Sequence, residues 1–364
     1  MLRVALNGRF TGTPQPTGTQ TASVQLFNAI LRQSGETEFV VFADSRFPGV
    51  EEWKNLERVS FVETPFQDWS RGRSQLWEQF LSPLLARRHG CKIMHHPMTT
   101  SPAWQNGIQS IVTLHDLNFL LHPEWYSRSF RIVYDLCALP GLRRCARVVT
   151  ISNFVRNQTS RELRIPDWRL GMIYNGVKPI HASAPWNGNY LFTAGSLQPH
   201  KNLARLIRAY RQIQNDYPGL ELVVAGRPQP RFSSDPELAD LLSTPGLRLT
   251  GYLSEEELAN AYAGARAFCY PSLEEGFGLP LLEAMTLGTP VLTSTVSCLP
   301  EIAGPATQVD PLSVEAIVGG VRHLLDLPET ERDHLITLGK EWAGRFSWKA
   351  AAQKYLALYA ELAS

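Results

Sequence analysis

The 364 residues correspond to about two domains of ordinary size. Hydrophobic residues make up 44% of the chain and charged residues 19%, which provides apolar side chains for full cores and argues against disorder. The 35 Lys and Arg balance the 34 Asp and Glu, and the resulting net charge of +1 excludes a strongly basic nucleic-acid binder.

The apolar runs and the cysteines indicate a cytoplasmic protein. No apolar run reaches the roughly 18 residues that cross a bilayer, and the first residues are too polar for a secretion signal. The five cysteines are scattered and form no CxxC pair. This pattern predicts reduced side chains, without a disulfide framework or a zinc site.

Short apolar runs alternate with amphipathic stretches through the first half of the chain. Strands are predicted at 2–7, 39–43, 59–62, 92–95, 109–114 and 148–151, and helical stretches at 21–32, 73–88 and 127–146. This alternation is typical of a parallel, doubly wound α/β sheet.

A stretch without periodicity, residues 177–189, contains Pro179, Pro185 and Gly188 and is predicted to be a linker. A second alternating series follows it. Strands are predicted at 190–194, 220–225, 248–250, 267–270, 291–293 and 307–309, and helices at 201–215, 314–325, 329–344 and 348–362. The sequence therefore predicts an α/β domain on each side of the linker.

Charge is uneven along the chain. Residues 1–170 contain 20 Lys and Arg against 14 Asp and Glu, and residues 171–364 contain 15 against 20. The basic residues gather near Trp69, Trp77, Leu84 and Leu85, in the clusters Arg71/Arg73, Arg87/Arg88 and Arg143/Arg144/Arg147. A solvated surface is one interpretation. Attraction to an anionic membrane surface or an acidic acceptor is the other.

Gly195 and Lys201 form the first candidate site. They lie between a predicted strand and a predicted helix, where ligands of doubly wound sheets bind. Gly195 permits a tight turn and close approach of a ligand. Lys201 places an ammonium beside a helix N-terminus, which suits a diphosphate. A loop lysine without a ligand is the alternative.

A glycine-rich loop after the strand at 267–270 forms the second candidate site. Gly276 and Gly278 leave backbone N–H groups bare before a helix, an anion-binding arrangement that is weak evidence alone. A diphosphate repels carboxylates, so Glu275 and Glu283 are each expected to accept hydroxyl pairs of a sugar or a ribose. An acid that stabilises the helix dipole is the alternative, and it accounts for Glu275 only.

Two weaker candidates lie in the first half of the chain. His115, followed by Asp116, comes at the carboxyl end of a predicted strand. A structural histidine and an N-capping aspartate are the alternatives. Gly18 opens the first predicted helix, whose N–H groups could meet a phosphate or be capped by Thr17 or Thr19.

The block Pro271–Ala284 resembles the signature of the retaining glycosyltransferases of family 4. In that family a Glu, seven residues and a second Glu stand within Pro-Ser-x-x-Glu-Gly-Phe-Gly-Leu-Pro. Individually weaker segments agree in order along nearly the whole chain, namely Asn7-Gly8-Arg9, Leu114-His115-Asp116, Ile151-Ser152-Asn153-Phe154, Asn175-Gly176-Val177, Gly195 with Lys201-Asn202, Gly251-Tyr252-Leu253 and Phe346-Ser347-Trp348.

The resemblance implies a GT-B fold, in which two Rossmann-like, doubly wound domains face each other across a cleft. It implies domains at 1–176 and 190–345, with residues 346–364 forming a helix that crosses back to the first domain. It also implies transfer of a sugar to an acceptor hydroxyl with retention of anomeric configuration, without a metal or another cofactor. Mannose or glucose from a GDP- or UDP-sugar is the expected donor. A lipid-linked or polysaccharide intermediate is the expected acceptor.

The resemblance also assigns roles to residues. Glu283 would bind the ribose, Lys201 the diphosphate and Glu275 the donor sugar, while His115 would reach the sugar from the acceptor-side domain. The expected catalytic residues are His115, Lys201 and Glu275. The expected donor-binding residues are Gly18, Gly195, His200, Lys201, Gly276, Phe277, Gly278, Leu279 and Glu283.

Two departures from the family pattern bear on phosphate binding. Many relatives carry Arg where this chain has His200, which near neutral pH is only partly charged unless the diphosphate raises its pKa. Close relatives often have Gly-Ile-Gly-Arg-Tyr where this chain has Thr17-Gly18-Thr19-Gln20-Thr21. The second difference weakens the phosphate role of Gly18.

The expected mechanism is front-face attack, in which the leaving phosphate accepts the proton of the acceptor. A double displacement would need a carboxylate on the far face of the sugar, and the sequence identifies none. A GT-B nucleotide-sugar epimerase and a non-catalytic nucleotide-sugar sensor are the alternative functions. A dehydrogenase is disfavoured because no Gly-x-Gly-x-x-Gly follows a strand.

Overall fold

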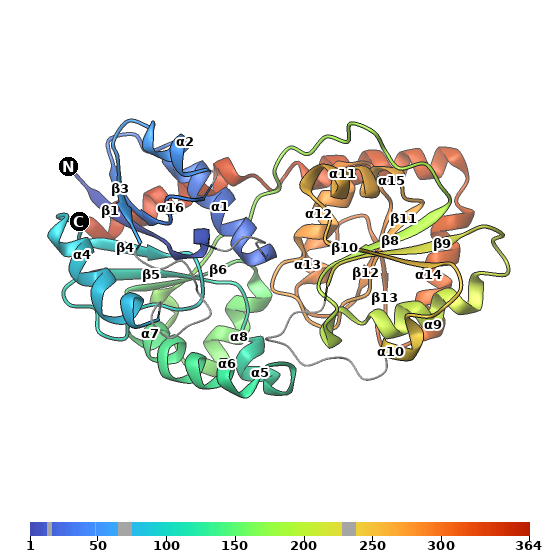
Figure 1. The fold of residues 1–364 in the computed structure, drawn as a ribbon, viewed down its shortest axis with the longest axis horizontal. Coiled ribbons are helices and arrows are strands. Elements are labelled where there is room, and N and C mark those ends of the chain that lie inside the picture. Colours follow the sequence, from blue (N-terminus) through green and yellow to red (C-terminus); the bar gives the residue numbers. More distant parts are fainter. Residues whose placement is uncertain (13–16, 48, 65–74, 228–237) are drawn as a thin grey trace. The chain divides into compact units, whose positions relative to one another are not determined.

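The computed structural model describes residues 1–12, 17–47, 49–64, 75–227 and 238–364. These residues form two compact units, each built on a parallel sheet (Figure 1). Unit 1 comprises residues 1–117, 128–176 and 347–364, and unit 2 comprises residues 118–127 and 177–346. The predicted cluster of Trp69, Arg71 and Arg73 lies outside the described residues.

The sheet of unit 1 has the order β3-β2-β1-β4-β5-β6-β7, with parallel pairing throughout. Its strands are β1 (Arg3–Gly8), β2 (Glu38–Ala43), β3 (Val59–Glu63), β4 (Ile93–His96), β5 (Gln109–Leu114), β6 (Arg147–Thr150) and β7 (Leu170–Met172). The sequence did not predict β7, because three residues at a sheet edge are too few to show a period. The strand order reverses at β1, so the loops after β1 and β4 meet at the topological switch point of the sheet.

The helices of unit 1 cover both faces of this sheet. They are α1 (Gly18–Leu31), α2 (Val50–Lys54), α4 (Ser82–Arg88), α6 (Arg128–Val133), α7 (Leu139–Arg144), α8 (Asn153–Leu163) and α16 (Trp348–Ala363). The helices predicted at 73–88 and 127–146 are each interrupted by a π-helical turn, η2 (Trp77–Leu81) and η4 (Tyr134–Ala138). Such turns are local changes to i→i+5 hydrogen bonds within a helix, and residue periodicity over a window of this length did not reveal them.

Consecutive residues of β4 point to opposite faces of the sheet of unit 1. Met94 packs in a core with Trp77 and other residues of the η2 and α4 layer. His95 instead packs against α16, where its ring stacks on Tyr355 at 4.8 Å and its Nδ1 lies 2.6 Å from the hydroxyl of Tyr359. The C-terminal helix is therefore part of the core of unit 1.

The sheet of unit 2 has the order β10-β9-β8-β11-β12-β13, again with parallel pairing throughout. Its strands are β8 (Tyr190–Ala194), β9 (Glu221–Ala225), β10 (Leu247–Gly251), β11 (Ala267–Tyr270), β12 (Val291–Ser294) and β13 (Thr307–Val309). The order reverses at β8, so the loops after β8 and β11 meet at the switch point of this sheet. The two sheets confirm the predicted doubly wound α/β architecture.

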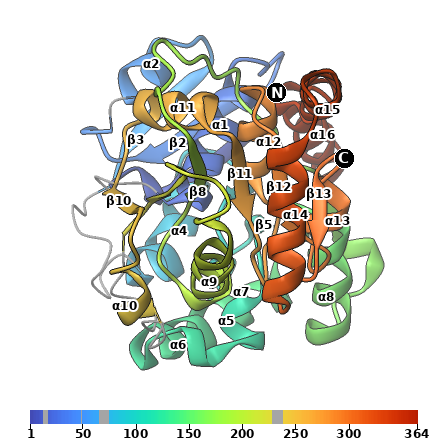
Figure 2. The same cartoon turned by 90° about the vertical axis from the view of Figure 1, so that its right-hand side faces the viewer.

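Unit 2 also contains helices. They are α5 (Asn118–Leu121), α9 (Leu203–Ile213), α10 (Leu238–Leu241), α11 (Glu255–Gly264), α12 (Leu279–Thr286), α13 (Leu299–Ile302), α14 (Val314–Asp326) and α15 (Glu329–Ala343). Figure 2 shows α9 and α14 over one face, where their apolar side chains share a core with β8, β9 and β11. Across the described ranges, no helix combines the length and apolar character needed to span a membrane.

Two segments differ from the expected domain boundaries. The expected linker, residues 177–189, packs within unit 2, where the N–H of Ala184 donates to Asn260 Oδ1 at 2.9 Å. Residues 118–127, expected in the first domain, also belong to unit 2, where the ring of Trp125 lies 5.3 Å from that of His200. Both depend on packing with residues distant in sequence, so local composition did not indicate them.

Candidate functional site

Lys201 is the centre of a polar cluster at the carboxyl edge of the sheet of unit 2. It ends the short 3-10 turn Pro199–Lys201 before α9, in the loop that follows β8. Its Nζ donates to the hydroxyl of Tyr270 at 2.8 Å and to Glu275 Oε1 at 2.7 Å. Because β8 and β11 are neighbours, the sheet joins Lys201 to a carboxylate 74 positions further along the chain.

Gly195 gives the loop after β8 its close approach to Lys201. Its φ of 151° lies in a region that side chains rarely adopt, and its N–H donates to the carbonyl of Ala225 at 2.9 Å. A Cβ at this position would lie 3.5 Å from Lys201 Cε. Gly195, Ser196, Lys201 and Tyr270 line a small pocket at this edge.

Glu275 neutralises Lys201 in this ligand-free site. Burial raises the pKa of Glu275, but the adjacent Lys201 ammonium outweighs burial and holds the pKa below its usual value. The backbone N–H of Glu275 donates to Ser297 Oγ at 3.2 Å, which fixes the loop. A diphosphate at Lys201 would therefore meet an ionised carboxylate on the same ammonium.

Glu283 has a different environment from Glu275. It lies one turn into α12, which begins at Leu279 after Gly278, whose φ of 93° is left-handed. The hydroxyl of Tyr262 donates to Glu283 Oε2 at 3.4 Å. Burial raises the pKa of Glu283, and Lys178 only partly offsets this effect. Glu283 therefore meets a neutral hydroxyl where Glu275 meets a cation.

His200 carries no positive charge in this site, which corrects the expectation of partial charge near neutral pH. Its side chain is buried, and burial together with the neighbouring Lys201 lowers its pKa to about 3. Its Nδ1 has no hydrogen-bond partner among the described residues. The ring packs beside Trp125, so His200 replaces the usual cation of the family with a neutral ring.

The remaining predicted residues of this loop divide between core and site. The side chain of Phe277 is buried, with its ring 5.8 Å from that of Phe346, so it serves the core. Gly276 precedes it in the loop, and Leu279 is the first residue of α12. The main chain of this loop leads into the helix N-terminus, as the sequence predicted.

His115 and Gly18 belong to unit 1, whereas Lys201, Glu275 and Glu283 belong to unit 2. His115 Nε2 donates to the carbonyl of Pro97 at 2.8 Å, so its hydrogen is on Nε2 and Nδ1 is an acceptor. Burial lowers the pKa of His115 to about 4, and the ring is neutral at physiological pH.

Gly18 begins α1, directly after the N-cap residue Thr17. The N–H of Thr17 donates to Gln20 Oε1 at 2.7 Å, so the helix entrance is capped from within the chain. A Cβ at Gly18 would meet open space. Glycine is therefore not required here by close packing, which agrees with the capping interpretation.

Sequence reasoning missed several side chains that organise this cluster. Tyr270 and Ser297 bind Lys201 and Glu275, as described above. Asn202, with a left-handed φ of 59°, donates from Nδ2 to the carbonyls of Pro271 at 2.9 Å and Pro311 at 2.7 Å. Each contact joins residues distant in sequence, and no local pattern records it. Among the described residues, no group of three or more His, Cys, Asp or Glu side chains is placed to hold a metal ion.

Comparisons with known proteins show the family to which the chain belongs. Residues 16–180 match the family model described as Glycosyltransferase Family 4, and residues 180–342 match the one described as Glycosyl transferases group 1. O-antigen chain mannosyltransferase B of Escherichia coli is 30% identical over 69% of this chain and 70% of that protein. O-antigen chain mannosyltransferase RfbU of Salmonella typhimurium is 27% identical over 65% of this chain and 64% of that protein.

Solved structures share the fold at low sequence identity. Sucrose-phosphate synthase from Thermosynechococcus elongatus has a TM-score of 0.75 at 18% identity, over 100% of this chain and 99% of that one. HepE of Anabaena, solved in complex with UDP-glucose, has a TM-score of 0.71 at 16% identity, over 99% of this chain and 100% of that one. The two parallel sheets and these neighbours define a GT-B fold. The chain belongs to glycosyltransferase family 4, as the resemblance indicated.

Proposed function

We propose that this enzyme is a retaining mannosyltransferase. It would transfer mannose from GDP-mannose to a hydroxyl of a lipid-linked or growing polysaccharide intermediate, without a metal ion. The names of the two O-antigen relatives support mannose and a polysaccharide acceptor. The observation that carries the proposal is Lys201, held between Glu275 and Tyr270 at the switch point of the sheet of unit 2.

The proposed chemistry is stabilisation of charge on a leaving diphosphate. Breaking the bond from the anomeric carbon to phosphate leaves negative charge on the diphosphate and positive charge on the sugar. Lys201 and the N-terminus of α12 would stabilise the diphosphate, as preorganised donors do in other transition states. Glu275, displaced from Lys201 by the diphosphate, would accept hydroxyls of the sugar, and Glu283 would accept those of the ribose.

The proposed route to retention is front-face attack. The acceptor oxygen would form its bond to the anomeric carbon while the bond to the diphosphate breaks. The departing phosphate oxygen would take the acceptor's proton. His115 supports this route, because a neutral ring with an accepting Nδ1 suits a sugar hydroxyl and not the neutralisation of a phosphate. No protein nucleophile is then required.

Thermal denaturation against nucleotide sugars is the first test of the proposal. GDP-mannose should raise the melting temperature more than UDP-glucose or dTDP-glucose, since a ligand stabilises the state that binds it. Transfer from GDP-mannose to octyl α-mannoside should persist in EDTA and give an α-linked product by NMR. A β-linked product, or a requirement for added divalent metal, would contradict the proposal.

The same assay separates the alternative functions. Conversion of the nucleotide sugar to an isomer without transfer would identify an epimerase. Binding without transfer or hydrolysis over a broad acceptor panel would identify a sensor. Binding of NAD without binding of any nucleotide sugar would identify a dehydrogenase.

We also propose that unit 1 associates peripherally with anionic membranes, where a lipid-linked acceptor would reside. In the helical stretch 75–88, Leu76, Phe80 and Leu84 recur every four residues and are 60%, 51% and 39% exposed. Trp104, 60% exposed, lies in the adjoining loop. The guanidinium of Arg87 donates to the carbonyl of Asn106 at 3.5 Å, which places α4 beside this loop.

Exposed arginines surround this apolar surface on two helices. Arg87 and Arg88 end α4, and Arg143 and Arg144 end α7. Arg144 Nη1 donates to the carbonyl of Ala103 at 3.5 Å, so α7 contacts the same loop. Apolar side chains flanked by arginines are the composition that binds an anionic lipid surface.

Vesicle co-sedimentation tests the membrane proposal. Wild type should bind vesicles that contain phosphatidylglycerol and not neutral phosphatidylcholine vesicles. Reversing two charges (Arg87→Glu with Arg88→Glu) should weaken binding by at least about tenfold, since each basic residue near the surface contributes about 1 kcal/mol. The pair Arg211→Glu with Arg322→Glu, at exposed positions of unit 2, is the matched control. Equal binding by both pairs, or equal binding to neutral vesicles, would contradict this surface.

A further inference from the structure

Tyr270 is the second partner of Lys201, and the fold holds it firmly. It is the last residue of β11, so its side chain and that of Phe268, two positions earlier, lie on the same face of the sheet. The two rings stack with centroids 5.6 Å apart, and the ring of Phe268 lies 4.9 Å from that of Tyr262. Tyr270 is only 3% exposed. A buried aromatic stack therefore fixes the place of its hydroxyl.

The stem of Lys201 reaches this hydroxyl across Gly195. A Cβ at Gly195 would lie 3.5 Å from Cε and 3.6 Å from Cδ of Lys201, so the stem runs against bare main chain. Its Nζ lies 2.8 Å from the hydroxyl oxygen of Tyr270 and 5.1 Å from the centroid of the ring. The ammonium therefore has both a hydrogen bond and a cation–π attraction to Tyr270.

The hydrogens of this cluster can be assigned from its chemistry. An ammonium only donates, so the oxygen of Tyr270 accepts from Lys201 and its own hydrogen is left for another acceptor. Burial raises the pKa of Glu275, and both Lys201 and a hydrogen bond from Tyr270 lower it. Lys201 also donates to Glu275 Oε1 at 2.7 Å. Within the described part of the chain, one of its three hydrogens is left for a ligand.

The two partners of Lys201 differ in charge. Glu275 is ionised and offsets the charge of the ammonium. Burial raises the pKa of Tyr270 well above its ordinary value, and the nearby carboxylate of Glu275 raises it further, so the phenol stays neutral. A neutral hydroxyl orients a cation without cancelling its charge. Glu275 therefore competes with an anion for Lys201, and Tyr270 does not.

We propose that Tyr270 is a positioning residue for a diphosphate, which holds the ammonium of Lys201 at the switch point and leaves its charge available. The identity of the diphosphate as that of the donor rests on the proposed function. Tyr270 acts through Lys201 and takes no part in the chemistry itself. Without its hydroxyl, Glu275 decides where the ammonium lies. Tyr270 and Glu275 therefore have opposite effects on the binding of a diphosphate.

Tyr190 provides a matched control for Tyr270. It begins β8, the strand that pairs with β11, and it is 1% exposed. Its hydroxyl donates to the carbonyl of Ala261 at 2.7 Å. Tyr190→Phe and Tyr270→Phe each remove one buried hydroxyl from the same sheet, so both should lower the melting temperature. Of the two, the hydroxyl of Tyr270 is the one that bonds Lys201.

The first experiment measures the binding of GDP and of inorganic pyrophosphate by calorimetry. Tyr270→Phe keeps the stacked ring and removes only the oxygen. It should weaken the binding of both ligands by about tenfold, because a hydrogen bond to a charged group contributes at least about that factor. Glu275→Gln should tighten binding, and Tyr190→Phe should leave it within about twofold of wild type. Wild-type affinity in Tyr270→Phe would overturn the proposal.

The second experiment observes the ammonium itself, by NMR of protein labelled with nitrogen-15 at lysine Nζ. Hydrogen bonds slow the exchange of these hydrogens with water, and Lys201 is assigned by the loss of its signal in Lys201→Ala. The wild-type signal should be visible and should persist with saturating GDP, because Tyr270 stays bonded. It should move and broaden in Tyr270→Phe and stay unchanged in Tyr190→Phe. An unchanged signal in Tyr270→Phe, or a wild-type signal that is absent or is lost with GDP, would contradict the proposal.

The third experiment measures turnover, which a merely structural tyrosine would not change. At saturating GDP-mannose, Tyr270→Phe should lower the rate of transfer to octyl α-mannoside by about tenfold or more, with the acceptor KM within about twofold of wild type. Tyr190→Phe should retain the wild-type rate. A wild-type rate in Tyr270→Phe would contradict the positioning role alone.

Failure of the proposed function gives a different result. An enzyme that neither hydrolyses nor transfers from any nucleotide sugar contradicts the proposed function. Calorimetry with pyrophosphate and the NMR measurement need no turnover, so they still decide whether Tyr270 holds Lys201 for a diphosphate.

Discussion

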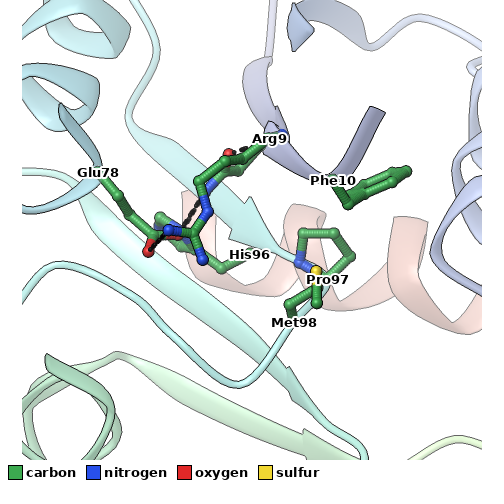
Figure 3. Close-up of a pocket in the computed structure, with 7 residues that line it drawn as sticks. Arg9, Phe10, Glu78, His96, Pro97 and Met98 are labelled. Atoms are coloured by element: carbon green, nitrogen blue, oxygen red, sulfur yellow. Dashed lines mark hydrogen bonds and ion pairs between the residues drawn. The ribbon is translucent and has the colours of Figure 1, made fainter. Parts of the chain in front are cut away.

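The two units each place an ion pair at the switch point of their sheet, and the pairs differ in how firmly they are held. In unit 1, Arg9 pairs with Glu78 (Figure 3), with side chains 12% and 2% exposed. Arg9 also bonds Thr100 at 2.8 Å, and Asn7 also holds Glu78. In unit 2, Lys201 is a single ammonium on a flexible stem, and its pair with Glu275 is more exposed, at 20% and 12%. A planar guanidinium with several partners is fixed, whereas an ammonium can change partners. The comparison teaches that the first pair is held in place by several partners, whereas the cation of the second is free to change its partner.

Removing one member of the fixed pair should have the largest effect. Glu78→Leu leaves the guanidinium of Arg9 buried without its partner, and we expect a loss of about 3–5 kcal/mol in the free energy of unfolding. The double variant Arg9→Met with Glu78→Leu should recover most of this loss, because no charge remains buried. Urea denaturation measures both. A loss below about 1 kcal/mol, typical of exposed pairs, would show that this pair is no firmer than a surface pair.

Removing the cation of the exchangeable pair should mainly affect catalysis. Lys201→Ala should lower turnover at saturating donor by about 100-fold or more, since an oxyanion-type donor contributes about 3–4 kcal/mol to the transition state. Arg322→Ala, which removes an exposed cation paired with Asp216, is the control and should retain wild-type turnover. A near-wild-type rate for Lys201→Ala would reject its role with the diphosphate.

Neutralising the carboxylate of the same pair should lower turnover by a smaller factor and should raise the affinity for GDP. Glu275→Gln should lower turnover by about tenfold. GDP alone should bind about fivefold more tightly, because Lys201 no longer has an ion pair that competes with the diphosphate. Calorimetry with GDP measures the second effect. Weaker binding of GDP would show that the two groups do not compete. A covalent glycosyl adduct on Glu275, detected by mass spectrometry in the wild type, would overturn front-face attack.

The last expected effect is confined to acidic solution and concerns the dependence of stability on pH. The pKa of His200 is about 3 in the folded chain, against 6.5 for an ordinary histidine, so unfolding takes up a proton between these values. The contribution of neutral His200 to the free energy of unfolding is fully present above pH 6.5. It is lost as pH falls toward 3, by up to about 1.4 kcal/mol per pH unit. His200→Gln should flatten this loss, and His89→Gln, at an exposed histidine, should not. Equal slopes would show that His200 is not held neutral.

The sequence located the cluster around Lys201 and Glu275 more readily than the ion pair of unit 1. Glu275, Gly278 and Glu283 lie within one short block whose spacing is informative by itself, and Lys201 follows a glycine at the end of a predicted strand. Arg9 and Glu78 come from two separate segments. Glu78 lies in a π-helical turn, so no spacing distinguishes it.

The sequence by itself determined the alternation of strands and helices, the doubly wound architecture and the family, because these depend on periodicity and on contiguous motifs. Only the tertiary structure decided which charges meet. It paired Lys201 with Glu275, kept His200 neutral and gave residues 118–127 to unit 2. The physical reason is that burial and partners from distant segments set the charge and hydrogen-bonding state of a side chain, and strand order brings those partners together.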